Sequence, residues 1–405
     1  MKIGIDISGF TSLIGAYDFI SNIIIALSAN AQKNGYEIFL IYKKDKNFYK
    51  KYSGLKKIYY KFIYLFKIIK CYEIIPNDGD FCAFQNLKII KINRNYKKVI
   101  KRLHFDCVLP ITNPKIDLAP IPIIRYLYDC QHKYYPQFFS PKERQNRDIY
   151  FKNMVKKYCI VNSKDVKNDL IKFYNADKNK IFSLPFTPKL KKEYIKDYRP
   201  EIIEKYKLPK KYFLMSCQFW IHKDHPTLFK AFAKLLQSTN CSDINLVCTG
   251  TIEEPRKQGY ITEIRSLIKN LGIEKNVYLL GCVPKDEQLE IMKKSLAVIN
   301  TTLFEGGPGG GSIWDSCALG VRSIISDIRV NLEIKNDLVH FFKTGDADDL
   351  CIKMIELLST PPPVYSIEKL ISKSDGNIAL LGDSLFEIIN TVINESKGKI
   401  YEQKY

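Results

Sequence analysis

The stretch at 301–327 reads TTLFEGGPGGGSIWDSCALGVRSIISD and joins a glycine-rich loop to a helical pattern. An apolar run at 296–300 precedes it, and the loop carries glycines at 306, 307, 309, 310 and 311. Glycines between a strand and a helix let backbone N–H groups approach an anionic ligand, and the helix N-terminus adds partial positive charge there. The stretch therefore predicts a phosphate-binding turn within an α/β fold.

The rest of the chain alternates β-branched runs with helical patterns, as doubly wound parallel sheets do. Strands are predicted at 2–7, 36–42, 105–110, 121–128, 158–162 and 181–185, and again at 212–217, 244–249, 277–280, 296–300, 321–326 and 338–342. The proline-rich, charged segment 188–211 between the two series is predicted to be a linker.

This pattern predicts the fold class α/β, with two Rossmann-like doubly wound parallel-sheet domains facing each other across a cleft. The amino-terminal domain is expected at 1–187 and the carboxyl-terminal domain at 212–380. A last helix within 381–405 is expected to pack back toward the amino-terminal domain. The cleft, at the carboxyl ends of both sets of strands, is the expected ligand site.

The formal charge of +20 is concentrated in part at 43–70, where lysines alternate with apolar residues at helical spacing. A basic amphipathic helix of this kind either lies on an anionic membrane surface or packs on the core with solvated lysines. The wider interval 43–92 is predicted to be an irregular insertion. The sequence has no helix-turn-helix, zinc-finger or RNP-like pattern, so nucleic acid is not an expected partner.

The cysteines are expected to be buried thiols rather than a disulfide framework. The chain has 11 of them, none in a C-x-x-C pair, and most lie within apolar runs. The opening MKIGIDISG is not apolar for long enough to be a signal peptide. We therefore expect a cytoplasmic protein, which would lie at the inner face of the cytoplasmic membrane if 43–70 binds an anionic surface.

Two carboxylates flank the glycine loop, and they have different interpretations. Glu305 follows a strand end, where its side chain would point into the cleft. Asp315 either reaches the ligand from the next helix or closes a capping box with Ser312, and both roles are compatible.

No metal site is expected. The pair His222 and His225 has no third ligand nearby in sequence, and the D-x-D patterns at 78–80 and 346–348 fall in the insertion and at a helix start.

Together these segments resemble glycosyltransferase family 4, whose members are retaining enzymes with the two-domain GT-B fold. The resemblance lies in the strand, Glu305, glycine loop and acidic residue followed by CALG and VRSIISD. It extends to SCQFWIHKDHPTLFKAF at 216–232, which is similar to the family's phosphate-binding lysine loop. It also includes YDCQHKYYPQFF at 128–139, which is similar to its histidine-bearing loop.

The resemblance implies catalytic roles for Lys223, Glu305 and His132. Lys223 would stabilise the departing diphosphate, Glu305 would hold hydroxyls of the donor sugar, and His132 would lie against that sugar. Asp315 would bind the ribose. The remaining donor-binding residues would be Gln218, Gly306, Gly307, Gly309, Gly310, Gly311, Ser312, Cys282 and Val283. Gly9 and Gly15 would form the acceptor-side loop of the amino-terminal domain.

The sequence departs from the family pattern in three places. The two acidic residues are ten positions apart instead of eight, and the second is Asp315 rather than a glutamate. Gln218 stands where the family has an arginine. The amino-terminal loop keeps only Gly9 and Gly15 where the family has a Gly-Gly turn.

The resemblance implies a retaining, metal-independent hexosyltransferase with no cofactor besides its nucleoside-diphosphate sugar. Its acceptor would be a glycan or lipid-linked glycan in bacterial-type surface polysaccharide synthesis. In the first of the two interpretations of 43–70, this segment would contact the membrane. Two alternatives remain open: a nucleoside-diphosphate-sugar epimerase of the same fold, and a non-catalytic basic binding module.

Overall fold

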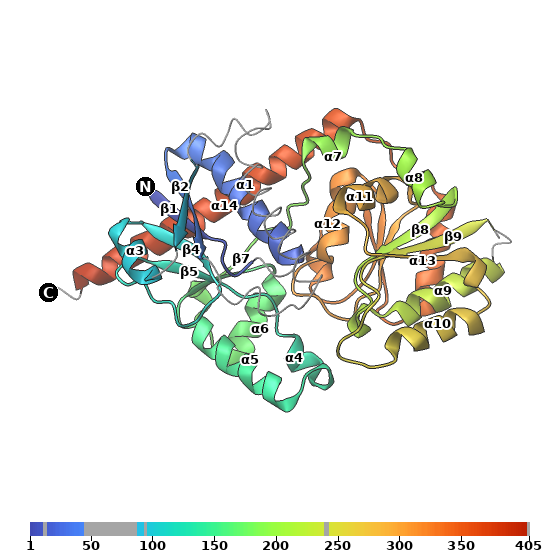
Figure 1. Ribbon diagram of the computed structural model, residues 1–405, viewed down its shortest axis with the longest axis horizontal. Helices are drawn as coiled ribbons and strands as arrows, with labels where there is room; N and C mark the ends of the chain where they lie inside the picture. Colours follow the sequence, from blue (N-terminus) through green and yellow to red (C-terminus); the bar gives the residue numbers. More distant parts are fainter. Residues whose placement is uncertain (11–13, 44–86, 93–94, 239–242, 403–405) are drawn as a thin grey trace, which may run out of the picture.

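Two parallel sheets organise the computed structural model, which describes residues 1–10, 14–43, 87–92, 95–238 and 243–402. Within these residues the amino-terminal sheet has seven strands, in the order β3-β2-β1-β4-β5-β6-β7. The carboxyl-terminal sheet has six, in the order β10-β9-β8-β11-β12-β13. Figure 1 shows the two domains side by side, each with helices around its sheet. The predicted fold class is confirmed.

The amino-terminal domain follows the alternation expected from its sequence. Its strands are β1 (Lys2–Asp6), β2 (Glu37–Lys43), β3 (Leu87–Ile92), β4 (Cys107–Ile111), β5 (Ile123–Tyr126), β6 (Tyr158–Val161) and β7 (Ile181–Ser183). Its helices are α1 (Ile14–Asn34), α3 (Tyr96–Arg102), α4 (Gln131–Tyr134), α5 (Pro141–Met154) and α6 (Lys164–Tyr174), with short 3₁₀ turns η3 (Pro136–Phe138) and η4 (Lys178–Lys180).

The carboxyl-terminal domain repeats this arrangement. Its strands are β8 (Lys211–Ser216), β9 (Ile244–Thr249), β10 (Val277–Gly281), β11 (Val298–Asn300), β12 (Ser323–Ser326) and β13 (Val339–Phe342). Its helices are α9 (His225–Ser238), α10 (Tyr260–Asn270), α11 (Lys285–Lys294), α12 (Gly310–Leu319) and α13 (Ala347–Ser359). Three 3₁₀ turns complete it: η5 (Ile221–Lys223), η6 (Glu274–Asn276) and η7 (Asn331–Glu333).

Burial explains why the sequences of the strands are continuous apolar runs and do not alternate between apolar and polar residues. Strands β4, β5, β6 and β9 are buried along their whole length. Helices cover both faces of a parallel sheet, so side chains of both orientations enter a core. The sequence signal for these strands was therefore length and β-branching, not period-two alternation.

Three segments differ from the sequence expectations. The interval 43–92 was expected to be irregular, but 87–92 forms β3, which pairs in parallel with β2 at the sheet edge. The linker 188–211 contains two short helices, α7 (Lys192–Lys196) and α8 (Glu201–Lys205). The basic pattern at 43–70 and the D-x-D at 78–80 lie outside the described residues, apart from Lys43 at the end of β2.

The last helix, α14 (Ile367–Glu402), begins earlier than predicted and crosses from one domain to the other (Figure 1). Near its start, Ser374 exchanges hydrogen bonds with the backbone of Leu190 in the linker. Farther along, Asp383 accepts a hydrogen bond from Asn30 of α1, and Glu395 accepts one from Tyr158. The helix therefore packs against the amino-terminal domain.

Among the described residues, α14 is also the one helix that is long and apolar enough to cross a membrane, over Ile367–Gly398. Leu385, Ile389 and Val392 are fully buried in the core shared with α1. A core helix with one long apolar face has the same length and composition, and the buried face of α14 packs in this core.

Candidate functional site

The site lies where the strand order of the carboxyl-terminal sheet reverses. Strands β8 and β11 are neighbours in that sheet, and the helical connections after them lead in opposite directions. Loops at such a switch point diverge and leave a crevice beyond the carboxyl ends of the strands. The loop after β8 carries Lys223, and the loop after β11 carries Glu305.

Lys223 and Glu305 form an ion pair across this crevice. Their side chains are only 9% and 14% exposed, so the pair is largely removed from water. Burial lowers the pKa of Lys223, but the Glu305 carboxylate outweighs it and the net pKa is raised. The ammonium is therefore charged at neutral pH, and a buried charge of this kind needs its partner or an anionic ligand.

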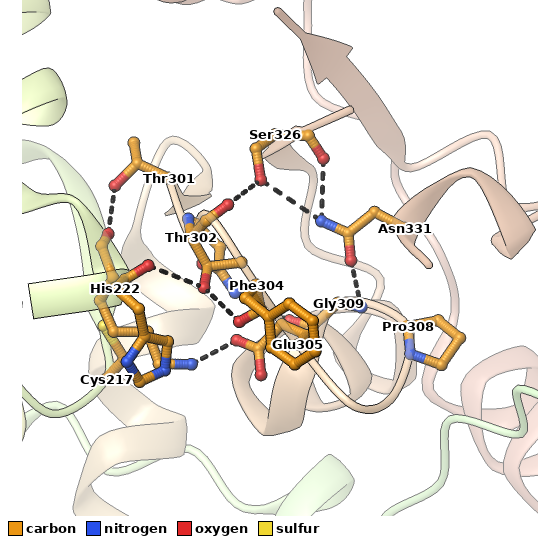
Figure 2. A network of polar contacts seen from close by, with 12 residues as sticks. Cys217, His222, Thr301, Thr302, Phe304, Glu305, Pro308, Gly309, Ser326 and Asn331 are labelled. Atoms are coloured by element: carbon orange, nitrogen blue, oxygen red, sulfur yellow. Dashed lines mark hydrogen bonds and ion pairs between the residues drawn. The ribbon is translucent and has the colours of Figure 1, made fainter. Parts of the chain in front are cut away.

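Backbone contacts hold the lysine loop in place (Figure 2). The Thr301 hydroxyl donates to the carbonyl of Lys223 at 2.7 Å, where Figure 2 shows it as a dashed line. The Leu303 amide donates to the carbonyl of His222 at 2.7 Å. The Thr302 hydroxyl is 3.2 Å from the same His222 carbonyl. The strand end that leads into the glycine loop thus also fixes the backbone that carries Lys223.

The glycine loop starts α12 through left-handed backbone. Gly309 is the N-cap at φ 72°, and Gly310 follows at φ 65°, a conformation that glycine adopts without strain. The Gly309 amide donates to Asn331 Oδ1 at 2.8 Å, and its carbonyl accepts from Asn300 Nδ2 at 2.9 Å. These contacts direct the N-terminus of α12, with its partial positive charge, toward the crevice.

The expected capping box of Ser312 and Asp315 is wrong. The two left-handed glycines begin the helix at Gly310, which places Ser312 inside its first turn, and the N-cap has no side-chain hydrogen bond. Asp315 is buried and pairs with Lys285 at the start of α11. The Lys285 ammonium is also 4.0 Å from Asp18 of α1, in the other domain.

Lys285 is a site residue that the sequence analysis missed. Burial opposes its charge, but Asp315 and Asp18 outweigh that effect and raise the pKa of Lys285. It follows Cys282 by three positions and Val283 by two, and both of these residues were expected to bind the donor. A basic residue directly after this pair of expected donor-binding residues was the available signal.

Gly306 and Gly307 serve a second purpose, because they meet the amino-terminal domain. A Cβ on Gly306 would lie 2.3 Å from the Tyr128 carbonyl oxygen and 2.8 Å from Asp129 Cβ. A Cβ on Gly307 would lie 3.1 Å from Asn162 Cβ. The Gly306 carbonyl also accepts a hydrogen bond from Ser163 at 3.2 Å. The glycine loop therefore forms part of the contact between domains.

Asp129 is a second residue that the sequence analysis missed. It follows β5 at the carboxyl edge of the amino-terminal sheet and lies beside Gly306. Burial raises the pKa of its carboxyl group, and the nearby Glu305 adds to this, while Arg147 and Lys223 oppose it. Its position one residue after a predicted strand could have marked it.

His132 lies in α4, buried, with Nε2 facing its own domain. That nitrogen is 3.1 Å from Asp148 Oδ1 and 2.8 Å from the Tyr174 hydroxyl. Burial lowers the pKa of His132, which favours the neutral ring. Its Nδ1 is buried without a hydrogen-bond partner. With Nε2–H donated to Asp148, Nδ1 is a hydrogen-bond acceptor without a partner.

The other predicted residues occupy the edges of the crevice. Gln218 is half-buried at the carboxyl end of β8, and Val283 is half-buried while Cys282 is exposed after β10. Gly9 follows β1, where a Cβ would meet the Thr112 hydroxyl at 2.1 Å, and Gly15 lies in the first turn of α1. No contact joins Gly9 or Gly15 to Lys223 or Glu305 among the described residues.

The described residues contain no group of three or more His, Cys, Asp or Glu side chains arranged to hold a metal ion. His225 stacks on Phe219 with ring centroids 4.0 Å apart, and His222 Nδ1 is 3.1 Å from Arg256. Asp346 caps α13 by accepting from the amides of Asp348 and Asp349. These residues therefore have structural partners.

The carboxyl-terminal domain matches the family model described as glycosyl transferases group 1 over residues 199–371. The matched segment contains Lys223, the glycine loop and Asp315, whereas His132 and Asp129 lie before it. Among curated proteins, no sequence relative matched the chain.

Solved structures resemble the whole chain at low sequence identity. A glycosyltransferase from Rickettsia africae aligns with a TM-score of 0.62 at 16% identity, covering 97% of this chain and 98% of the other. Anabaena HepE in complex with UDP and glucose aligns with a TM-score of 0.59 at 12% identity, covering 99% and 100%. The lipopolysaccharide outer core galactosyltransferase WaaB aligns with a TM-score of 0.58 at 16% identity, covering 96% and 99%. These similarities extend the shared GT-B fold to the domain before the group 1 segment.

Proposed function

We propose that this protein is a retaining, metal-independent glycosyltransferase. It moves a sugar from a nucleoside diphosphate to a glycan or lipid-linked glycan acceptor. The observation that carries the proposal is the buried ion pair of Lys223 and Glu305 beside the glycine-started N-terminus of α12. A cation and a helix N-terminus at one point suit a diphosphate, and a carboxylate next to them suits sugar hydroxyls.

In the proposed reaction the bond from the anomeric carbon to the diphosphate oxygen breaks, and a bond to the acceptor oxygen forms on the same face. The acceptor hydroxyl loses its proton to the departing diphosphate. Lys223 and the α12 amides stabilise the charge on that leaving group, a contribution of about 3–4 kcal/mol per well-placed donor. Glu305 then exchanges its bond with Lys223 for hydroxyls of the donor sugar.

The remaining groups orient the donor. Asp315 binds the ribose. Burial raises the pKa of this carboxyl group, and its ion pair with Lys285 opposes that effect. His132 accepts a hydrogen bond from the sugar at Nδ1, because Asp148 holds its Nε2 proton. Gln218 donates a hydrogen bond to the diphosphate without adding charge.

The acceptor side is proposed from the resemblance and from the neighbours. HepE was solved with UDP-glucose, and WaaB is named as a lipopolysaccharide galactosyltransferase. A bacterial-type surface polysaccharide as product, and a cytoplasmic site of action at the inner face of the membrane, suit this chain by analogy. The basic segment 43–70 would supply the membrane contact.

A panel of UDP-, GDP-, ADP- and CMP-sugars tests the proposal. We expect one nucleotide class to raise the melting temperature, because a ligand that binds only the folded state stabilises it by mass action. Transfer of the sugar only when an acceptor is present, into a product with the same anomeric configuration as the donor, supports a retaining transferase. Turnover of the nucleotide sugar into an isomer without any acceptor would instead identify an epimerase. Salt-dependent binding of polyanions without nucleotide-sugar binding would identify a basic binding module.

A further inference from the structure

The turn at 329–333, between β12 and β13, contacts both the other domain and the glycine loop. It contains η7 and carries three side chains with inter-element contacts: Arg329, Asn331 and Glu333. Arg329 and Glu333 reach α6 of the amino-terminal domain. Asn331 lies between them and reaches the start of α12.

Glu333 caps a helix that belongs to the opposite domain. Its Oε2 accepts the Lys164 amide at 2.9 Å and its Oε1 accepts the Asp165 amide at 2.7 Å. These are the first two residues of α6, whose N-terminal amides have no partners within the helix. A carboxylate at a helix N-terminus is also favoured by the helix dipole. One side chain therefore satisfies two amides across the domain interface.

Arg329 also contacts α6, through ion pairs with two of its carboxylates. Its guanidinium is 2.6 Å from the Tyr134 hydroxyl and lies 3.2 Å and 3.5 Å from the carboxylates of Asp165 and Asp169. It also lies over the Tyr134 ring at 5.1 Å from the centroid. An acidic group on amides and a basic group on carboxylates fix both the position and the orientation of α6 against the turn.

Asn331 links this contact to the proposed donor pocket (Figure 2). It is fully buried, accepts the Gly309 amide at Oδ1, and donates from Nδ2 to the Ser326 carbonyl at 2.8 Å. Gly309 is the left-handed residue that starts α12. A displacement of the 329–333 turn would therefore move the Gly309 backbone and, with it, the amides at the start of α12.

We propose that the 329–333 turn is an interdomain latch that sets the geometry of the glycine loop when the domains are closed. Arg329 and Glu333 are positioning residues: they hold α6, and Asn331 transmits that contact to Gly309. The effect on donor binding rests on the proposed function, whereas the latch itself does not.

Hydrogen exchange on the ligand-free full chain tests the latch. In Glu333→Gln, one amide acceptor and the charge are lost, so exchange of the peptides covering 163–166 and 306–312 should rise by about tenfold. The matched control is Glu356→Gln on α13, where a half-exposed carboxylate pairs only locally with Lys353. Unchanged exchange at both peptides in Glu333→Gln would overturn the latch. A rise at 163–166 alone would overturn the link to the glycine loop.

A charge exchange tests Arg329 without depending on activity. Arg329→Asp places a carboxylate opposite Asp165 and should raise exchange at 163–166. Adding Asp165→Arg restores an opposite-charge pair at this position and should return exchange to within about twofold of wild type. No rescue in the double variant, with both proteins folded, would contradict the role of this pair.

Steady-state kinetics then distinguish a positioning role of Glu333 from a general loss of structure. Glu333→Gln should raise KM for the donor about tenfold and change kcat by less than about threefold, because the reacting groups stay in place. Glu333→Asp, which keeps the charge, should recover part of the loss. A fall in kcat alone would contradict a positioning role. If wild-type protein binds no nucleotide sugar while the exchange results hold, the proposed function fails and the latch stands.

Discussion

The ammonium of Lys223 and the carboxylate of Glu305 come from segments 82 positions apart and meet as a buried ion pair. Each follows one of the two strands that flank the switch point of the carboxyl-terminal sheet. Removing one partner leaves an uncompensated buried charge, which typically costs 3–5 kcal/mol. The pair therefore has consequences for stability as well as for ligand binding.

Neutralising this pair should abolish activity without unfolding the protein. Lys223→Met and Glu305→Gln singly should each lower kcat/KM by about 100-fold, and each leaves a buried charge. The double variant removes both charges and should melt close to wild type while staying inactive. Steady-state kinetics and thermal melting check this, with the exposed Lys230→Met as control. Full activity in the double variant would place the chemistry elsewhere.

Gly309 and Gly311 should respond in opposite ways to alanine. At Gly309, φ is 72° and a Cβ would lie 2.7 Å from Ile313 Cβ, so Gly309→Ala should cost about 1–2 kcal/mol or more in unfolding free energy. At Gly311 a Cβ meets nothing within 4 Å, and alanine favours helix by about 0.5–1 kcal/mol. Chemical denaturation of both variants measures the difference. Equal stability would contradict the left-handed helix start.

Gly306→Ala should interfere with domain contact rather than with folding. The added Cβ would lie 2.3 Å from the Tyr128 carbonyl oxygen, and backbone cannot move aside as a side chain can. We expect donor KM to rise about tenfold or more, at a nearly unchanged melting temperature. Small-angle scattering should show a larger radius of gyration. Gly376→Ala in α14, where a Cβ has open space, is the control.

Asp315 should matter for nucleotide binding because it forms the buried floor of the pocket together with its ion-pair partner Lys285. Asp315→Asn should weaken nucleoside-diphosphate binding about tenfold by calorimetry, through loss of a charge-assisted hydrogen bond to the ribose. The exposed Asp375→Asn, which removes only a surface pair with Lys192, should leave binding unchanged. Unchanged affinity of Asp315→Asn for the nucleoside diphosphate would contradict the proposal that Asp315 binds the ribose.

The buried Lys189 should make stability depend on pH. Burial lowers its pKa to about 7, and the ammonium has only the Thr187 carbonyl at 3.5 Å and the Trp314 ring at 5.9 Å. The lysine pKa in the unfolded chain is about 10.4, so the unfolded state binds the extra proton between about pH 7 and 10. Stability of the wild type should therefore rise with pH in that window by up to about 1.4 kcal/mol per unit.

Lys189→Met removes this titration. The variant should be more stable than wild type at pH 7, and its advantage should shrink as the pH rises toward 10. Urea unfolding at pH 7, 8 and 9 measures the difference, with the exposed Lys210→Met as control. A constant difference between wild type and Lys189→Met across these pH values would show that Lys189 keeps an ordinary pKa.

Local sequence patterns predicted most elements because their causes are local. Apolar runs of strand length and the glycines of 306–311 remain recognisable without knowledge of any partner segment. Strand β3 was missed because an edge strand with lysines at 88 and 91 lacks a continuous apolar run. The capping box was wrong because Ser312 and Asp315 satisfy its spacing, whereas the helix start is decided by the φ angles of Gly309 and Gly310.

The candidate site was predictable only in part. The resemblance selected Lys223 and Glu305, and the structure brings them together. Asp129 and Lys285 were missed because each lies near the site only through the approach of the two domains or of two loops. The resemblance also selected His132, but the direction of its two ring nitrogens depends on Asp148 and Tyr174, which come from α5 and α6.

The sequence by itself determined the fold class, the two-domain division and the glycine-rich start of α12, because these depend on hydrophobic pattern and on backbone freedom within short segments. Only the tertiary structure decided which charges meet: Lys223 with Glu305, Lys285 with Asp315, and Glu333 with the amides of α6. Pairing of charges depends on distance in space and on exclusion of water, and neither is set until the strands are ordered and the domains are in contact.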